Sequence, residues 1–237
     1  MFAKLLPSLA LTGAVALGCA CSGPGNAPAE TYYEKYVDLG DADSLAKVEM
    51  AAHLVPTPQQ LAWQQWELTA FIHFTVNTFS GKEWGDGRES PDLFFPTAID
   101  TDQWVEVLKD AGFRMVMLTA KHHDGFCLWD TKYTDYKTTA EDCPFHEHKN
   151  ADIVKSMFDA FRAKGIGIGA YFSKADWHCP DYWKEDLRKD GLTSRGPSYD
   201  PKEYPEVWNR FKKYTKNQVL ELCENYGKLD ILWFDAG

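Results

Sequence analysis

The 237-residue sequence lacks any block of lysine and arginine that could bind nucleic acid. It contains 35 Asp and Glu residues against 25 Lys and Arg residues, which gives a formal net charge of -10. Phosphate binding requires a clustered positive field. We therefore expect no nucleic-acid partner, and a neutral or small substrate is the more natural ligand.

Signature motifs of metal and cofactor sites are also missing. The four cysteines beyond the N-terminal region (Cys127, Cys143, Cys179 and Cys223) show no CxxC spacing, so neither a zinc ribbon nor a redox motif is indicated. No HExxH is present, and no G-x-G-x-x-G follows the first predicted strand. We expect neither a metal nor a cofactor. Disulfide bonds and free buried thiols are equally compatible with this pattern.

No segment is long and apolar enough to span a membrane, and the first residues are typical of an export signal. MFAKLLPSLALTGAVALGCACSG has one early lysine, an apolar stretch from Leu9 to Leu17 and then small residues. We interpret residues 1–21 as this signal. AVALGC resembles a bacterial lipoprotein box, in which Cys19 would carry a lipid anchor. Cleavage and release into the periplasm is the alternative. Residues 22–56 are expected to be a linker and N-terminal extension.

From residue 57 onward, apolar strands alternate with capped amphipathic helices. The predicted strands are AFIHF, RMVMLTA, IGIGAYFS and LDILWFD. Thr57 and Gln60 form a capping-box pattern before the first strand. In the helix of residues 99–112 the expected inward face is Trp104, Val107, Leu108 and Ala111. In the helix of residues 150–165, Asn150 is the expected cap, and the expected inward face is Ile153, Val154, Met157, Phe158 and Phe161.

This alternation indicates an α/β fold with a parallel sheet covered by helices. A doubly wound open sheet and a (β/α)8 barrel both fit. Polar residues follow several different strands, and this favours the TIM-type barrel, whose sites form at the carboxyl ends of its strands. We expect residues 57–237 to be the first half of a catalytic barrel, with only the first four βα units present in a truncated chain.

The run ILWFD ends in a carboxylate. Strand alternation predicts that Trp233 and Asp235 point to the same side of the sheet. A carboxylate beside an aromatic wall can attack an electrophile or stabilise a positive charge. A cap for a following helix is an equally weighted interpretation.

Three further stretches carry candidate site residues. KHHDGFCLW follows the second strand; its histidines can bind hydroxyl groups or act as acid and base, although adjacent histidines at a strand end should point apart. The Glu83-Trp84 pair could bind a hydroxyl and stack on a sugar. Tyr171 shares a strand face with Gly167 and Gly169, which we expect to leave space at the mouth of the sheet. A second histidine cluster, HEH at residues 146–148, is interpreted as a solvated loop.

In this order and on successive βα units, IHF..NTF..KEWG, KHHDGFCLW, GAYFS and WFD resemble glycoside hydrolase family 29, the α-L-fucosidases. The resemblance covers roughly residue 57 to the end, and KHHDGF is its most specific motif. It implies a (β/α)8 barrel and an exo-acting retaining enzyme that releases terminal α-L-fucose from glycans or glycoconjugates.

Carried over by position, the resemblance implies that Asp235 is the nucleophile. It implies that the fucose-binding residues are His73, Glu83, Trp84, His122, His123, Tyr171 and Trp233. The acid/base residue of the family lies beyond the fourth strand, so we expect it outside this chain and expect the fragment alone to be inactive. Thr75 and Ala236 depart from the glycines usual in the family, which puts the loop geometry in question.

Two other functions fit parts of the sequence. A metal-dependent barrel hydrolase or isomerase would use His122, His123, Asp124 and His178. A non-catalytic glycan-binding module would keep the sugar pocket without the chemistry.

Overall fold

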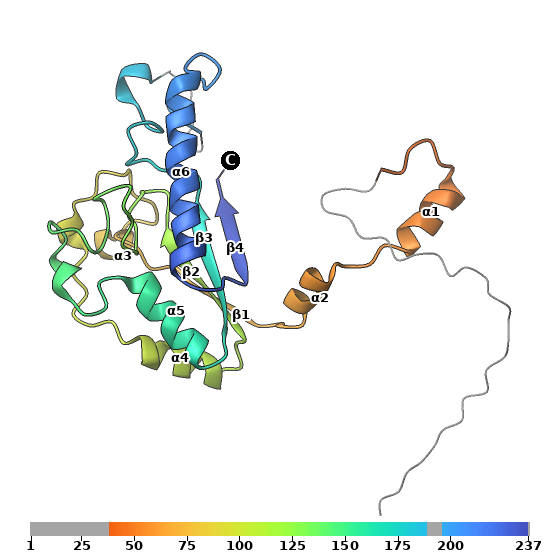
Figure 1. Ribbon diagram of the computed structural model, residues 1–237, viewed down its shortest axis with the longest axis horizontal. Coiled ribbons are helices and arrows are strands. Elements are labelled where there is room, and N and C mark those ends of the chain that lie inside the picture. The colour runs from red at the N-terminus through yellow and green to blue at the C-terminus, as the bar shows by residue number, and fades with distance from the viewer. Residues whose placement is uncertain (1–37, 189–195, 237) are drawn as a thin grey trace, which may run out of the picture. The chain divides into compact units, whose positions relative to one another are not determined.

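The computed structural model describes residues 38–188 and 196–236 (Figure 1). The predicted export signal and Cys19 lie outside the described residues. The chain divides into two compact units, residues 1–61 and residues 62–237. In the described part, no helix is both long and apolar enough to cross a bilayer.

Two short helices precede the sheet in the sequence. Helix α1 spans Ser44–Ala52, and Asp43 caps it by accepting a hydrogen bond from the Ala46 N–H. Helix α2 spans Pro58–Gln64. The Thr57 N–H donates to Gln60 Oε1 at 2.8 Å, and the Gln60 N–H donates to Thr57 Oγ1 at 3.2 Å. These reciprocal bonds confirm the predicted capping box.

Four parallel strands form one sheet in the order β1-β2-β3-β4. The strands are β1 (Thr69–Ile72), β2 (Met115–Lys121), β3 (Gly167–Ser173) and β4 (Ile231–Asp235). The predicted α/β fold with a parallel sheet is therefore confirmed. Strand β1 ends at Ile72, two residues before the predicted Phe74.

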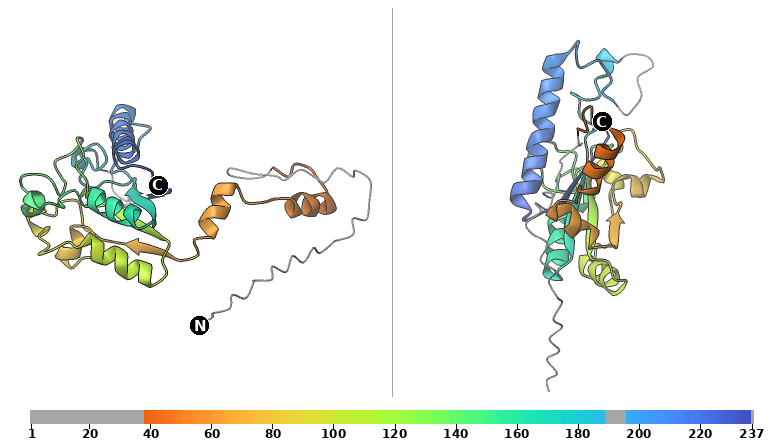
Figure 2. Two further views of the ribbon diagram at one scale, coloured as in Figure 1. Left: turned by 60° about the horizontal axis from the view of Figure 1, so that its bottom comes forward. Right: turned by 90° about the vertical axis from the view of Figure 1, so that its right-hand side faces the viewer.

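Helices α4 (Thr101–Asp110), α5 (Ile153–Ala163) and α6 (Pro205–Asn225) pack on one face of this sheet. Helix α6, the long blue helix, runs along the strands in Figures 1 and 2. The shorter elements are α3 (Asn77–Ser80), η1 (Pro91–Leu93), η2 (Pro144–Glu147) and η3 (Glu185–Leu187). The core between helices and sheet includes Val116, Leu118, Ile168, Phe158 and Leu222. This packing leaves the opposite face of the sheet to build the site.

The inward face of α4 differs from the prediction. Val105 is fully buried, whereas Val107 is 55% exposed and Ala111 is exposed. Trp104 and Leu108 pack against the core as expected. The buried stripe therefore starts at Thr101 and follows the i, i+3, i+4, i+7 spacing, which places Val107 to one side of it.

The start of α5 also differs from the prediction. Asp152 caps the helix, because its Oδ1 accepts a hydrogen bond from the Lys155 N–H at 2.9 Å. Asn150 instead donates its side-chain N–H to the Ile99 carbonyl at 3.3 Å. All five residues of the predicted inward face of α5 are buried. The core positions were thus correct and the cap was two residues too early.

The sheet face opposite the helices carries a small apolar cluster. Met115, Met117 and Tyr171 are buried there. A Cβ atom added to Gly169 would lie 2.5 Å from the Cε atoms of both methionines. The predicted space beside the glycines is therefore wrong, since methionine side chains fill it.

Strand β2 contains an irregularity that decides where its last residues point. Its register against β3 shifts between Thr119 and Lys121. Lys121 consequently lies on the helix side, with its Nζ 4.3 Å from the centre of the Phe172 ring. His122 follows on the other side, stacked on Tyr171. A bulge commonly redirects side chains next to a functional site in this way.

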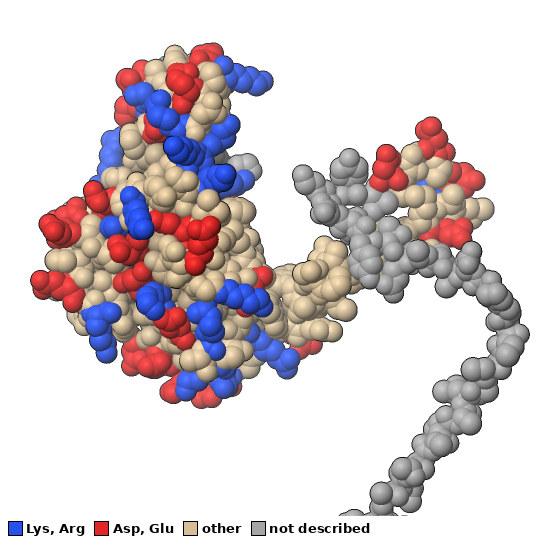
Figure 3. All heavy atoms as spheres, in the orientation of Figure 1, with Lys and Arg blue, Asp and Glu red and all other residues tan. Residues whose placement is uncertain are grey.

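Charged residues are spread among uncharged ones on the face of residues 62–237 that Figure 3 shows. On the face shown in Figure 3, acidic and basic side chains are interspersed. Pairs such as Lys155 with Asp159, four residues apart on α5, contribute to this pattern. Exposed pairs of this kind add little to stability.

Candidate active site

Asp235 lies at the carboxyl end of β4 with its side chain about half exposed. The Tyr171 hydroxyl donates to its Oδ2 at 2.7 Å, and the Ala236 N–H donates to its Oδ1 at 2.7 Å. The hydrogen bond from Tyr171, chiefly, lowers the pKa of Asp235 below its ordinary value. The carboxyl group is therefore ionised at neutral pH, as a nucleophile or an electrostatic stabiliser requires.

Three imidazole rings lie next to this carboxylate. The ring centre of His122 is 4.7 Å from that of His73 and 4.3 Å from that of His123. The Nε2 of His123 lies 3.9 Å from Asp235 Oδ2. The expectation that the adjacent histidines point apart is wrong, because both lie beyond the end of β2, where strand alternation no longer applies.

Burial keeps two of these rings neutral. It lowers the pKa of His122 to about 3, with the neighbouring His123 and His73 acting in the same direction. It also lowers the pKa of His73. A neutral imidazole has one donor and one acceptor nitrogen. Such rings suit hydrogen bonds to the hydroxyl groups of an uncharged, polyhydroxylated ligand.

Aromatic rings form the wall beside the carboxylate. Trp233 is half exposed, and its ring meets the edge of Phe71 at 5.7 Å between centres. Phe71 also lies 5.6 Å from the Tyr171 ring. Phe71 was absent from the sequence prediction, although alternation along β1 places it on the face of His73. This wall offers an apolar surface to one side of a ligand.

His123 links the sheet to two loops. Its Nδ1 lies 2.6 Å from Ser173 Oγ at the end of β3. The Trp84 ring is 6.1 Å from the His123 ring, and the Trp177 ring is 5.3 Å from it. The Trp177 N–H donates to the His123 carbonyl at 2.9 Å. Trp84 thus joins the site, as predicted from its position, and Trp177 is an addition that the sequence did not single out.

The loop that carries Trp84 is fixed by hydrogen bonds of its backbone to the Glu89 side chain and by contact with the segment after β3. Glu89 accepts hydrogen bonds from the N–H groups of Asp86 at 2.8 Å and Gly87 at 3.0 Å. Gly87 has a φ of +80°, and a Cβ there would lie 2.5 Å from the backbone of Trp177. The loop is therefore pressed directly against the segment after β3.

Glu83 is the one predicted site residue that the structure leaves apart. Its side chain is exposed, and within the described residues it makes no hydrogen bond or ion pair. Seven predicted residues do gather at the mouth of the sheet: His73, Trp84, His122, His123, Tyr171, Trp233 and Asp235.

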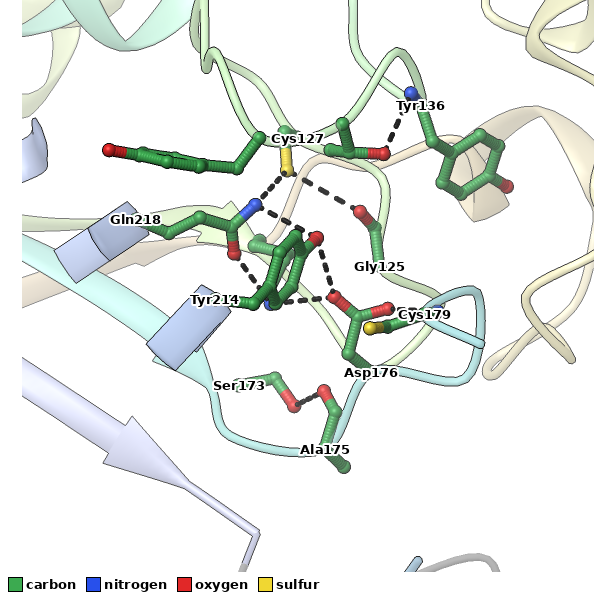
Figure 4. Close-up of polar contacts among 12 residues, drawn as sticks. Gly125, Cys127, Tyr136, Ser173, Ala175, Asp176, Cys179, Tyr214 and Gln218 are labelled. Atoms are coloured by element: carbon green, nitrogen blue, oxygen red, sulfur yellow. Dashed lines mark hydrogen bonds and ion pairs between the residues drawn. The ribbon is translucent and has the colours of Figure 1, made fainter. Parts of the chain in front are cut away.

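A buried polar network supports the site from the helix side. Lys121 Nζ pairs with Asp176 Oδ2 at 2.8 Å and donates to Gln218 Oε1 at 3.0 Å. Figure 4 shows Asp176, Tyr214 and Gln218 joined by hydrogen bonds. The Lys121 and Asp176 side chains are only 0% and 1% exposed. Because these residues precede His122 and Trp177 directly, the network fixes the segments on which both sit.

Sequence reasoning missed this network, but a signal for it exists. Lys121 ends a strand in which every other residue except Thr119 is apolar, and a lysine buried there requires an anionic partner. No pattern in the sequence identifies Asp176 as that partner, because it comes from a loop after a different strand.

The residues of the metal hypothesis do not converge. Among the residues that the structure describes, no group of three or more His, Cys, Asp and Glu side chains is placed to hold a metal ion. Asp124 is buried and accepts hydrogen bonds from the Asn77 amide and the Phe126 N–H, each at 2.7 Å. His178 stacks on Tyr136 at 3.9 Å between ring centres. Asp124 is thus engaged in hydrogen bonds and His178 in ring stacking.

The cysteines and the HEH cluster take no part in the site. Cys127, Cys143 and Cys179 are buried free thiols, and Cys223 is exposed and free. His148 stacks on Phe145 with ring centres 4.5 Å apart, so this loop is partly packed rather than fully solvated.

Comparison with known proteins identifies close relatives of the chain. The sequence profile of the family described as α-L-fucosidase matches residues 48–237. The chain is 37% identical over 199 residues to Alpha-L-fucosidase 1 of Arabidopsis thaliana. This alignment covers 84% of this chain and 34% of that protein. An alignment to a rice relative covers 30% of that protein. The chain therefore spans about a third of the length of these two plant relatives.

Solved structures agree with these matches. A crystal structure of a Bacteroides ovatus protein, provisionally named an α-L-fucosidase, aligns with a TM-score of 0.70 at 42% identity over 84% of this chain and 30% of that one. A glycoside hydrolase family 29 α-L-fucosidase of Bacteroides thetaiotaomicron aligns with a TM-score of 0.60 at 29% identity, over 75% of this chain and 41% of that one. That enzyme was trapped as a covalent intermediate with 2-fluoro-fucosyl fluoride.

Proposed function

The chain belongs to the α-L-fucosidase family, glycoside hydrolase family 29, and from this premise we propose that it forms part of an exo-acting retaining α-L-fucosidase. The substrate would be a glycan or glycoconjugate with a terminal α-L-fucose. The observation that supports this most directly is an ionised Asp235, held by Tyr171 beside three imidazole rings and an aromatic wall.

The proposed reaction is a double displacement with Asp235 as nucleophile. Its carboxylate attacks the anomeric carbon, the bond to the leaving oxygen breaks, and a fucosyl ester forms on the protein. Water then attacks the anomeric carbon and releases fucose. The Tyr171 hydroxyl orients the carboxylate and keeps it ionised before the attack.

The proposed sugar contacts divide into polar and apolar groups. His73, His122 and His123 would hydrogen-bond the fucose hydroxyls, and two of these rings are kept neutral by burial. Trp233 and Tyr171 would line the apolar methyl side. Glu83 and Trp84 complete the proposed set, with Glu83 reaching the sugar by movement of its exposed side chain.

A retaining mechanism also needs a second carboxylic acid, about 5–5.5 Å from the first, to protonate the leaving oxygen. We propose that this acid lies outside residues 1–237. The related covalent intermediate from Bacteroides thetaiotaomicron supports the double displacement but concerns that enzyme.

We further propose that the sheet is part of a (β/α)8 barrel. The helices cover one face, and the proposed sugar contacts occupy the other at the carboxyl ends of the strands, which is the arrangement of barrel enzymes. For residues 1–21 we propose export, with Cys19 as the lipid anchor, so that the enzyme acts in the periplasm or cell envelope of a bacterium.

The nucleophile assignment is tested with an Asp235→Gly variant of the protein produced from its complete reading frame. We expect turnover of an aryl α-L-fucoside to fall at least about a thousandfold, because the ester can no longer form. Added azide should restore part of the rate by taking the place of the missing carboxylate.

Asp159→Gly is the control, since Asp159 is an exposed carboxylate on α5 away from the site. It should retain the wild-type rate. Full turnover in the Asp235→Gly variant would exclude the proposed mechanism. A wild-type protein that binds fucosylated glycans and never turns them over would instead identify a glycan-binding module.

A further inference from the structure

We propose that Ser173 is a positioning residue that keeps the proton of the neutral His123 ring on Nδ1, so that the lone pair of Nε2 faces Asp235 and any substrate bound there. Ser173 is the last residue of β3 and is fully buried. The inference deepens the proposed function and rests on it, because it concerns the environment of Asp235 as the nucleophile.

The Ser173 hydroxyl lies between a carbonyl oxygen and an imidazole nitrogen. Its Oγ is 2.7 Å from the Ala175 carbonyl oxygen, a contact drawn in Figure 4, and 2.6 Å from Nδ1 of His123. A hydroxyl carries one proton, and a carbonyl oxygen can only accept. Ser173 therefore donates to Ala175, and its oxygen accepts a hydrogen bond from the Nδ1–H of His123.

The reverse arrangement would bring two acceptor atoms together. If Ser173 donated to Nδ1, its oxygen would face the Ala175 carbonyl oxygen at 2.7 Å with no proton between them. Water cannot relieve this repulsion, because the serine is buried. In a neutral imidazole ring, a proton on Nδ1 means that Nε2 carries a lone pair. The partner of one ring nitrogen thus determines the state of the other.

The carboxylate of Asp235 favours the other tautomer of His123. A proton on Nε2 would point towards a negative charge 3.9 Å away. That distance is longer than a hydrogen bond, and the Asp235 side chain is 47% exposed, so water screens the attraction. The contact of Nδ1 with Ser173 is both shorter and buried. Ser173 consequently decides the tautomer.

A proton kept away from Nε2 leaves the nucleophile reactive. Asp235 already accepts hydrogen bonds from the Tyr171 hydroxyl and the Ala236 N–H. A third donor would stabilise the negative charge that has to leave the carboxylate as its oxygen attacks the anomeric carbon. With a lone pair on Nε2, His123 instead accepts a hydrogen bond from a substrate hydroxyl and does not compete for the carboxylate.

The backbone holds the three groups in register independently of the serine hydroxyl. Ser173 is paired with Asp235 across β3 and β4, and the Lys174 N–H donates to the Asp235 carbonyl at 2.8 Å. The Trp177 N–H donates to the His123 carbonyl at 2.9 Å. Loss of the hydroxyl therefore leaves these backbone bonds in place, and its main effect falls on the proton of the ring.

Neutron diffraction from deuterium-exchanged crystals locates this proton directly. The protein would be produced from its complete reading frame and crystallised without ligand near neutral pH. We expect deuterium on Nδ1 of His123 and none on Nε2. Deuterium on Nε2, whether alone or together with Nδ1, would overturn the assignment.

Ser173→Ala tests the consequence for the reaction. The variant removes the acceptor of Nδ1, so the proton should move to Nε2 and face Asp235. With an aryl α-L-fucoside we expect kcat to fall about tenfold, since the new hydrogen bond has to weaken as the carboxylate attacks. KM should change by less than about twofold, whereas a displaced histidine would raise it. A wild-type kcat in this variant would overturn the role of Ser173.

Ser198→Ala is the matched control. Ser198 is also fully buried, and its hydroxyl donates to the Lys184 carbonyl at 2.9 Å and accepts from the Lys184 N–H at 2.7 Å. This variant loses the same two kinds of hydrogen bond without touching a histidine, so kcat and KM should stay at their wild-type values. Equal losses of kcat in both variants would mean that Ser173 acts only through stability.

Ser173→Thr keeps a hydroxyl at the same position. Its crystals should again show deuterium on Nδ1 of His123, and most of the wild-type kcat should remain. Deuterium on Nε2 in this variant would contradict the assignment, because the hydroxyl is then shown not to select the tautomer.

The assignment and the proposed function fail separately. Deuterium on Nε2 in a wild-type protein that hydrolyses the fucoside would overturn the role of Ser173 and leave the fucosidase function intact. A wild-type protein with deuterium on Nδ1 and no turnover of fucosides would refute the fucosidase function, and with it the effect of Ser173 on a nucleophile. The diffraction experiment needs no substrate, so it distinguishes the two failures.

Discussion

At the scale of single residues, Tyr171 has the clearest measurable effect, because its hydroxyl is the main cause of the lowered pKa of Asp235. If Asp235 is the nucleophile, activity is present above this pKa and is lost as the pH falls through it. In Tyr171→Phe the pKa of Asp235 rises, so the acid limb of the kcat/KM profile moves to higher pH. A pH–rate profile on an aryl fucoside measures this shift.

Tyr226→Phe provides the matched control. Tyr226 donates to Asp152 at 2.7 Å, so this variant also loses a Tyr–Asp hydrogen bond, at the start of α5. Both variants should lose about 1 kcal/mol of stability. An acid limb that stays in place in Tyr171→Phe, or moves equally in both, would contradict the role given to Tyr171.

Ala236 carries backbone strain next to the proposed nucleophile. Its φ is +58°, in the left-handed region that costs an L residue about 1–2 kcal/mol. Ala236→Gly removes this cost and adds back some unfolded-state entropy. We expect a net gain of about 0.5–1 kcal/mol in the free energy of unfolding, measured by urea denaturation.

The comparison is Ala160→Gly, in the middle of α5, where the backbone is helical. That change should cost about 1 kcal/mol. Opposite signs for the same substitution would establish the strain at Ala236, and a loss at both positions would argue against it.

The sequence predicted that the site residues would lie together, but it did not predict the neighbouring rings that pack against them. Asp235 and the histidines follow strands of a parallel sheet, whose carboxyl ends share one edge. Their proximity therefore follows from strand order alone. Phe71 was overlooked although strand alternation places it on the face of His73. Trp177 was missed because its role depends on which ring it meets, and sequence spacing carries no such information.

At the scale of elements, the features that depend on residues close in sequence were predicted, and those that depend on tertiary contacts were not. The capping box of Thr57 and Gln60 formed as expected, since it involves residues three apart. The cap of α5 was assigned to Asn150 instead of Asp152 because both are good N-cap residues and only tertiary contacts choose between them. The methionines that fill the space at Gly169 come from a neighbouring strand, so no local pattern reveals them.

The bulge in β2 turns Lys121 to the buried helix side, so the stability of the fold depends on the ion pair of Lys121 with Asp176. Lys121→Met leaves Asp176 charged and without its cation, which should cost about 3–5 kcal/mol. The double variant Lys121→Met with Asp176→Asn removes the stranded charge and keeps an acceptor for the Cys179 N–H. We expect it to recover most of the loss in a thermal or urea unfolding experiment.

The exposed pair of Lys155 with Asp159 is the control for this experiment. Lys155→Met should change stability by less than about 1 kcal/mol, because water already solvates both groups. A Lys121→Met variant as stable as this control would mean that the buried pair contributes nothing to the fold.

At the scale of the whole molecule, the parallel α/β architecture followed from apolar strands alternating with amphipathic helices. The order of the strands in the sheet is the simplest that such an alternation permits. Closure into a barrel involves contacts beyond the four described strands, so it stays a prediction.

The proposed lipid anchor concerns the whole protein and can be tested separately from its activity. In a bacterial host, the wild-type protein should partition into the detergent phase of a Triton X-114 extraction. Cys19→Ser should move it to the aqueous phase, whereas Cys21→Ser should leave it in the detergent phase. Aqueous partitioning of the wild-type protein would favour plain cleavage and release.

His73 and Asp235 stand near opposite ends of the folded unit in sequence and are brought to one rim only when β4 docks beside β3. The rim that they share is consequently the last part of this sheet to be completed during synthesis. The proposed function predicts that an unreactive fucose mimic binds only nascent chains long enough to include β4, so its binding would report that β4 has docked.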